Sequence, residues 1–440
     1  MKKATLCTVL LFCNLFISNN LSAQEAIVHV DDVERFWIAY DSIQTTTDSM
    51  KQIDFIQRLY INKGTIGLKE FMGETGANAE KFIKMIKQDK AKLDTIRPYT
   101  LSVLEQKPLI EEKLKKMKEL YADFKGGDIY FTIGINNSGG KALGKNVFIG
   151  CERVTYERKD WAVMLVLHEF VHTMHKNNNQ QMLGHSIFEG MADFVAELAF
   201  GQDLAVYEPN RHTAFGLKNE KAIWEDFKSY IHFNRNSKFF GWIYGKRELN
   251  GVEMRDLGYF IGHRICKSYY DKATDKRQAL KEIIDLDLNT DEQAKAFLLA
   301  SGYVPKEDLE FIQNLKFSDK IPQSKNTKIY GYTLTDDSIV FKLTTNNEQT
   351  DVQKISIAGT FNAWNPKAEG FQLKNIEVRN PDKVGTEGAH YELVLPKSKL
   401  EKGKTYLFKF VINEEDWQEP PVFAQNVGFD GNYLNLSVVY

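Results

Sequence analysis

The chain has 440 residues, of which 43% are hydrophobic and 26% are charged, and its formal net charge is −2. This composition is typical of a folded globular protein and excludes a disordered or fibrous one. The length exceeds one ordinary hydrophobic core, so we expect two or more domains. The chain has no basic tract or basic-aromatic stripe, and we therefore expect no nucleic acid partner.

The N-terminus has the pattern of a secretory signal peptide. Lysines follow Met1, residues 4–17 are largely apolar, and the small residue Ala23 precedes Gln24. The apolar run is too short for a permanent membrane anchor, and a lipid on Cys13 would require a small residue where the bulky Phe12 stands. We expect cleavage of residues 1–23 and an exported mature protein, periplasmic, cell-surface or extracellular, with no transmembrane segment.

Two cysteines remain after this cleavage, because Cys7 and Cys13 belong to the signal peptide. Cys151 and Cys266 lack the spacing of a zinc-binding pair. In an oxidising compartment they form either one disulfide or two buried thiols, and the sequence leaves both readings open.

The next segment is predicted to be helical and then to form a small sheet. Residues 25–125 repeat apolar side chains at intervals of three and four. After two glycines, residues 128–134 and 146–150 have the pattern of strands, separated by a Gly-rich turn over 136–140. We expect this sheet directly before the helix that carries the most informative motif.

Three helices are predicted in the middle of the chain and a β-rich region at its end. The helices cover residues 160–176, with Asp160 as N-cap, then about 186–200 and 254–271. Residues 318–329 are polar and are predicted to be a linker. Beyond residue 330 a small β-sandwich is predicted. Its expected strands cover residues 338–343, 354–358, 391–395, 406–412 and 434–439.

The motif is His168-Glu169-Phe170-Val171-His172, the H-E-x-x-H pattern. Positions i and i+4 share one face of a helix, so both imidazoles can reach one cation. Glu169 lies off that face, where it can take a proton from metal-bound water. The alternative is an ordinary histidine pair on a helix, and a third ligand would decide between the two.

Glu189 is the candidate third ligand, on the following helix. Two histidines, one carboxylate and one water make a catalytic zinc site. Asp193, one turn later, can accept a hydrogen bond from a ligand histidine and fix its tautomer. The alternative is a capping box between Ser186 and Glu189. The pattern with a third histidine does not fit, and His175 is instead predicted to be a cation near the helix C-terminus.

The region from about residue 31 to residue 315 resembles predicted zinc-dependent proteases of the gluzincin, thermolysin-like clan. The resemblance rests on H-E-x-x-H followed by the E-x-x-x-D motif, and on residues 133–134, 138–140, 149–152 and 257–262. It implies a mainly helical zincin-like metallopeptidase domain over residues 24–317, with a helical part (25–125) and an active-site part (126–317). It also implies one zinc ion held by His168, His172 and Glu189, Glu169 as the base, and a peptide or protein substrate.

An oxyanion donor is also required for such chemistry. Tyr259 and His263 share a helix face at i and i+4, and Tyr244 lies upstream. We name Tyr259 and His263 as candidates, with core packing or a surface hydrogen bond as the alternative role. The Gly-Ala-Met-Glu-Asn motif of gluzincin aminopeptidases is absent, so exopeptidase action is not inferred.

The C-terminal region resembles glycogen-binding carbohydrate-binding modules, which are immunoglobulin-like β-sandwiches. The resemblance rests on residues 355–364, 406–417 and 430–435 within the domain 330–440. It implies an α-glucan site whose residues are Trp364, Lys409, Trp417 and Asn435. The acidic turn 413–416 departs from the family, and many such modules only pack against a catalytic neighbour.

The fold class expected from these patterns is α+β. The function expected is a secreted zinc metallopeptidase. Two alternatives stay open: a surface glycan-binding protein whose hydrolase domain has decayed, and a structural or chaperone-like secreted protein with a non-catalytic metal site.

Overall fold

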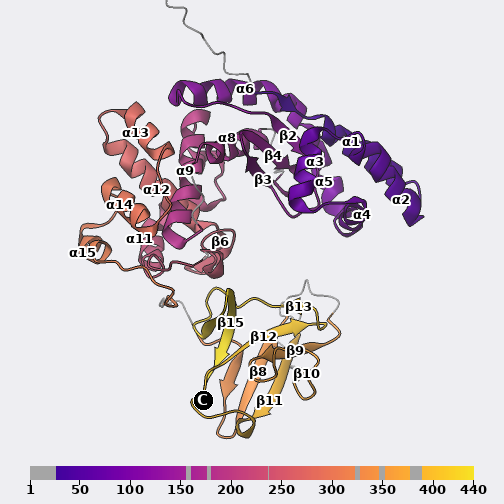
Figure 1. Cartoon of the computed structure of the whole chain (residues 1–440), viewed down its shortest axis with the longest axis vertical. Coiled ribbons are helices and arrows are strands. Elements are labelled where there is room, and N and C mark those ends of the chain that lie inside the picture. The colour runs from indigo at the N-terminus through magenta and orange to yellow at the C-terminus, as the bar shows by residue number, and fades with distance from the viewer. Residues whose placement is uncertain are drawn as a thin grey trace, which may run out of the picture. The chain divides into compact units, whose positions relative to one another are not determined.

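The computed structural model is an α+β protein (Figure 1). Its chain divides into two compact units. The first unit comprises residues 1–118 and 122–159, and the second comprises residues 119–121 and 160–440. This division falls inside the region predicted to be one metallopeptidase domain. The predicted signal peptide and residues 176–179 lie outside the described part of the chain. The structure describes residues 26–154, 160–175, 180–235, 237–322, 328–345, 352–376 and 389–440.

The first unit confirms the helical prediction for its N-terminal part. Its core is aromatic, with the rings of Phe36, Trp37, Tyr60 and Phe82 in edge-to-face contacts, an arrangement that aromatic quadrupoles favour. The helices are α1 (Asp31–Ile43), α2 (Ser49–Ile56), the π-helical turn η1 (Gln57–Ile61), α3 (Ile66–Thr75), α4 (Ala79–Gln88), α5 (Lys90–Leu101), α6 (Val103–Leu120) and α7 (Cys151–Val154). Short connections join α1 to α6 in sequence, and α7 follows the sheet.

The predicted small sheet is also present in the first unit. Its order is β1-β2-β4-β3, with β1, β2 and β4 parallel and β3 antiparallel to β4. The carboxylate of Glu152 accepts hydrogen bonds from the backbone N–H groups of Gly134 (2.8 Å) and Asn136 (2.9 Å), and fixes the start of the Gly-rich turn. The strands are β1 (Val28–His29), β2 (Ile129–Thr132), β3 (Gly140–Leu143) and β4 (Asn146–Gly150).

The helices of the second unit pack around α9, which contacts both α8 and α12. Gly190 on α9 and Gly262 on α12 allow the closest approach, since a Cβ atom at Gly262 would lie 1.7 Å from the carbonyl oxygen of Ser186. The elements are α8 (Trp161–Met174), α9 (Met182–Phe200), α10 (Leu204–Tyr207), α11 (His212–Phe227), η2 (Ser237–Phe240), β5 (Lys246–Leu249), β6 (Val252–Arg255), α12 (Leu257–Lys272), α13 (Lys276–Ile284), α14 (Asp291–Ser301), η3 (Lys306–Asp308) and α15 (Leu309–Gln313).

Three details differ from the predicted helices. Asp160 precedes α8, but its side chain makes no capping hydrogen bond. Helix α9 begins at Met182, so Ser186 lies inside the helix and donates to the Met182 carbonyl (2.8 Å), which excludes the capping box. The predicted start of α12 belongs to the hairpin β5–β6.

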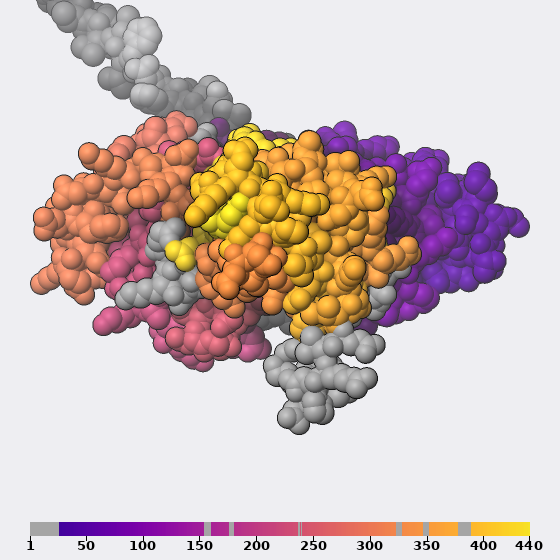
Figure 2. Space-filling view, turned by 90° about the horizontal axis from the view of Figure 1, so that it is seen from below, coloured from indigo at the N-terminus to yellow at the C-terminus, as the bar shows by residue number. Residues whose placement is uncertain are grey.

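The described residues of the C-terminal region form a nine-stranded antiparallel sheet, coloured orange to yellow in the space-filling view (Figure 2). Alternate residues of β12, such as Phe408 and Phe410, enter its core. The five predicted strands are present, and β7, β10, β13 and β14 add to them. The elements are β7 (Tyr332–Leu334), β8 (Ser338–Thr344), β9 (Ile355–Gly359), β10 (Gln372–Ile376), β11 (His390–Pro396), η4 (Lys397–Lys399), β12 (Tyr406–Ile412), β13 (Asp416–Trp417), β14 (Val427–Asp430) and β15 (Tyr433–Val438).

The two cysteines that remain after the predicted cleavage are both buried. Cys266 is a buried free thiol, so the Cys151–Cys266 disulfide is not formed. Burial raises the pKa of both thiols. Among the helices of the described segments, none combines the length and the apolar character that crossing a bilayer requires.

Candidate metal centre

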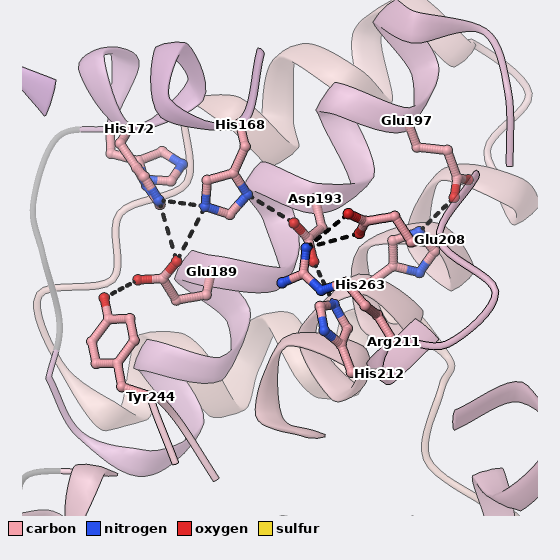
Figure 3. Close-up of polar contacts among 11 residues, drawn as sticks. His168, His172, Glu189, Asp193, Glu197, Glu208, Arg211, His212, Tyr244 and His263 are labelled. Carbon is pink, nitrogen blue, oxygen red and sulfur yellow. Dashed lines mark hydrogen bonds and ion pairs between the residues drawn. The ribbon is translucent and has the colours of Figure 1, made fainter. Parts of the chain in front are cut away.

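Three predicted ligand atoms converge between α8 and α9 (Figure 3). The Nε2 atoms of His168 and His172 lie 3.1 Å apart, and Oε2 of Glu189 lies 3.4 Å and 3.3 Å from them. Zinc bonds of about 2.0–2.1 Å in tetrahedral geometry give ligand–ligand distances of about 3.3 Å. The three side chains therefore have the spacing that one zinc ion requires.

The two histidines and Glu189 lie in a mostly buried site. Both histidines come from one face of α8, and their rings meet edge to face with centroids 4.8 Å apart. Phe188 stacks on the His172 ring at 4.5 Å. His168 is 9% exposed and Glu189 is 2% exposed. Burying such polar groups is costly unless they bind one another or a cation, and the distances between these three suit either case.

The Nδ1 atom of His168 lies 2.8 Å from Oδ1 of Asp193, the predicted outer partner. The other oxygen of Asp193 lies 2.8 Å from Nε2 of His212, at the start of α11. Although burial alone would raise the pKa of Asp193, the hydrogen bonds from both histidines lower it well below its ordinary value. With a proton on Nδ1, His168 presents a free lone pair on Nε2. His212 was not predicted, because no spacing in the sequence links it to Asp193.

The second oxygen of Glu189 is also engaged. The Tyr244 hydroxyl donates to Oε1 at 2.5 Å, and Nε2 of His185 lies 3.3 Å from the same oxygen. Burial and the Glu189 charge raise the pKa of Tyr244, so its hydroxyl keeps its proton. His185 was not predicted either, although it stands four residues before Glu189 and hence on the same face of α9.

His175 is an outer partner of His172 instead of the predicted cation. Their Nδ1 atoms lie 3.3 Å apart, and Nε2 of His175 lies 2.9 Å from the sulfur of Met191. Burial and the neighbouring His172 lower the pKa of His175 well below its ordinary value. The Nδ1 atom of a neutral His175 can accept a hydrogen bond from the Nδ1–H group of His172. The Nε2 atom of His172 then keeps its lone pair free. The cation prediction is wrong because desolvation of the His175 ring and the neighbouring His172 both disfavour its charged form.

Glu169 lies beside this ligand set. Burial raises the pKa of its carboxyl group, the charges of His172 and His168 lower it, and that of Glu189 raises it again, with a net increase. A carboxylate with a raised pKa is a stronger proton acceptor than an exposed one.

No protein family, curated protein or solved structure matches this chain.

The two predicted oxyanion donors are placed differently. The Tyr259 ring stacks against His168 with centroids 6.0 Å apart and an interplanar angle of 11°. His263 lies outside the ligand cluster, where its Nε2 atom is 3.2 Å from Oε2 of Glu197. Of the three candidates considered from the sequence, Tyr244 is the one with a hydrogen bond to a predicted metal ligand.

The four predicted glycan-binding residues all lie in the C-terminal sheet region, two on strand faces opposite the core and two as a pair of indoles. Lys409 and Asn435 alternate with core residues of β12 and β15 and therefore point away from the core. The indoles of Trp364 and Trp417 lie 6.3 Å apart, and Trp417 is 39% exposed. Lys409 is buried, with Nζ 2.5 Å from Glu419 Oε1, and Asn435 donates to the Tyr433 carbonyl at 3.0 Å. Both polar groups thus already have protein partners.

Proposed function

We propose that the protein is a zinc-dependent hydrolase that cleaves amide bonds in a peptide or protein. His168, His172 and Glu189 would hold one zinc ion. The observation that carries the proposal is the convergence of three ligand atoms at distances of 3.1–3.4 Å. Three protein ligands leave one position for water, as catalytic zinc sites do.

The chemistry follows from the residues around that position. When bound, zinc supplies a water with a pKa lowered to about 7 and polarises a substrate carbonyl. Glu169 takes the proton of the attacking water and returns it to the leaving nitrogen. The buried surroundings of Glu169 favour this exchange, because they raise the proton affinity of its carboxylate. Tyr244 and Tyr259 are the hydroxyl-bearing residues beside the ligands.

The experiment is metal analysis of the purified protein together with a Glu169→Gln variant. We expect one zinc per chain in both proteins and hydrolysis of a denatured protein substrate by the unsubstituted chain alone. The loss should be at least about 100-fold, the usual contribution of general acid–base catalysis. Absence of stoichiometric zinc, or equal hydrolysis by the variant, would refute the proposal. Zinc without hydrolysis in either protein would favour a decayed or structural site.

A second proposed activity is α-glucan binding by the C-terminal sheet. It is supported by the paired indoles of Trp364 and Trp417, whose flat faces suit glucose rings. Trp364→Ala should abolish retention on a glycogen column. The control is Val394→Ala, which changes an exposed apolar residue on β11. Equal retention of the two variants, or none by the unsubstituted chain, would remove this activity.

We further propose a zincin-like fold for residues 24–317 and an immunoglobulin-like fold for residues 330–440. The zincin-like assignment of residues 24–317 is supported by the small sheet, the two ligand-bearing helices and the order in which they follow. The immunoglobulin-like assignment of residues 330–440 is supported by the antiparallel sheet and its apolar core. Export is proposed from the N-terminal pattern, and Gln24 at the start of the mature chain would be the result expected from protein sequencing.

A further inference from the structure

We infer that Tyr244 and His185 form a clamp on Oε1 of Glu189, so that Glu189 offers only Oε2 to the metal. In this arrangement Tyr244 is a positioning residue for the metal ligand. The inference rests on the proposed metal site. It goes beyond that site because it fixes how the acidic ligand binds and therefore how many positions remain open.

The two oxygens of Glu189 have different partners. Oε2 faces the ligand nitrogens of His168 and His172, at 3.4 Å and 3.3 Å. Oε1 is turned to Tyr244, at 2.5 Å from its hydroxyl, and to His185. A hydrogen bond from a hydroxyl to a carboxylate is among the stronger hydrogen bonds of proteins, because the acceptor is charged. Moving Oε1 to the metal would break this bond, whose charged acceptor is buried while Tyr244 is partly exposed.

The backbone around Tyr244 is built to present this hydroxyl. The preceding Trp242 and Ile243 are fully buried, and the Trp242 carbonyl accepts a hydrogen bond from the N–H of Gly258 at 2.9 Å. Tyr244 itself has φ of 55°, in the left-handed region that bulky residues rarely adopt. Such backbone strain persists where the surrounding structure enforces it, and it clusters at functional sites. The turn thus holds Tyr244 in place at the expense of backbone strain.

His185 supports the clamp from α9. Its side chain is fully buried, one turn before Glu189, and its ring meets the Tyr244 ring edge to face at 5.3 Å. Tyr244 is 46% exposed, so it lies between the buried ligands and solvent. With Oε1 held on this side, two nitrogens and one oxygen bind the ion, and the fourth position is left for water.

The test uses cobalt(II) in the metal-free full-length protein, because four-coordinate cobalt(II) absorbs visible light more strongly than five-coordinate cobalt(II). The unsubstituted chain should give the strong spectrum. In Tyr244→Phe the freed Oε1 can join the metal, so the absorption should weaken, and zinc affinity should fall about 10-fold or more, as for other outer-sphere partners. The matched control is Tyr269→Phe, whose hydroxyl donates to Glu282 instead.

His185→Leu tests the same clamp from the helix, and circular dichroism confirms that each variant is folded. It should weaken the absorption in the same direction, and it replaces Tyr244→Phe should that variant not fold. Unchanged spectra and zinc affinities in the folded variants would overturn the clamp and leave the metal site intact. A failure of the unsubstituted chain to bind either metal would instead refute the proposed function.

Discussion

The three candidate ligand residues are each fixed through the atom that does not face the other two ligand atoms. Nδ1 of His168 is bound to Asp193, Nδ1 of His172 to His175, and Oε1 of Glu189 to Tyr244. Each contact orients its ligand and sets which atom keeps a free lone pair. Such outer partners are a large part of what makes a metal site tight.

Asp193→Asn should lower zinc affinity about 10- to 100-fold, the usual effect of losing an outer carboxylate. The amide cannot accept charged hydrogen bonds from both His168 and His212, so the His168 ring loses its fixed orientation. Competition with a coloured chelator measures the change. Asp271→Asn, which alters a carboxylate paired with Lys267, is the control and should bind as the unsubstituted chain does. Equal affinities would show that Asp193 does not support the ligand.

At this scale the sequence predicts contacts within one helix better than contacts between helices. His168 and His172 share a face through their spacing alone, and so do Glu189 and Asp193. His185 could have been found by the same rule. His212 and Tyr244 reach the centre only through the packing of α11 and the turn before β5, and no local pattern carries that information.

Among the elements, the contact of α9 with α12 decides where Glu189 lies. Gly262→Ala should destabilise the protein by about 3 kcal/mol or more, because the new methyl group would clash with the Ser186 carbonyl, which is backbone and cannot rotate away. Urea unfolding measures this loss. Gly73→Ala on α3 meets no neighbouring atom and should instead stabilise by up to about 1 kcal/mol. A small effect at Gly262 would mean that the helices can separate without loss.

The bounds of helices and strands are predicted well where apolar residues recur at regular intervals. Strand β12 matches the predicted range 406–412 because core residues alternate along it. The hairpin β5–β6 was missed, since its short strands are mostly charged or exposed. The start of α9 was placed too late because Gln181 supplies no side-chain cap, so the sequence holds no signal at that point.

The first turn of helix α14 contains a carboxyl group, that of Asp291, whose titration makes the stability of the fold depend on pH. Burial, followed by the charge of Glu292, raises the pKa of Asp291 to about 6, and its Oδ1 atom has no hydrogen-bond partner among the described residues. The unfolded value is about 3.9. The folded chain therefore holds this proton more tightly, and the stability that it contributes is full below about pH 4 and is lost as the pH rises through about 6.

Asp291→Asn removes this titration. The variant should be more stable than the unsubstituted chain at pH 7 and no more stable at pH 4, as judged from urea midpoints at both values. Glu310→Gln changes an exposed carboxylate on α15 and is the control. A stability difference that is the same at both pH values would contradict the assignment.

For the whole molecule, the metal should act as a stabilising ligand of the second unit, because all three ligand residues belong to it. An ion that binds the folded chain at a free concentration 100 times its Kd stabilises it by about 2.7 kcal/mol. Chelation should therefore lower the temperature of one calorimetric transition, and added zinc should restore it. His168→Gln removes one ligand and should abolish this response. Transition temperatures that change with neither chelator nor zinc would show that α8 and α9 hold no ion between them. The same would follow if the His168→Gln variant responded like the unsubstituted chain.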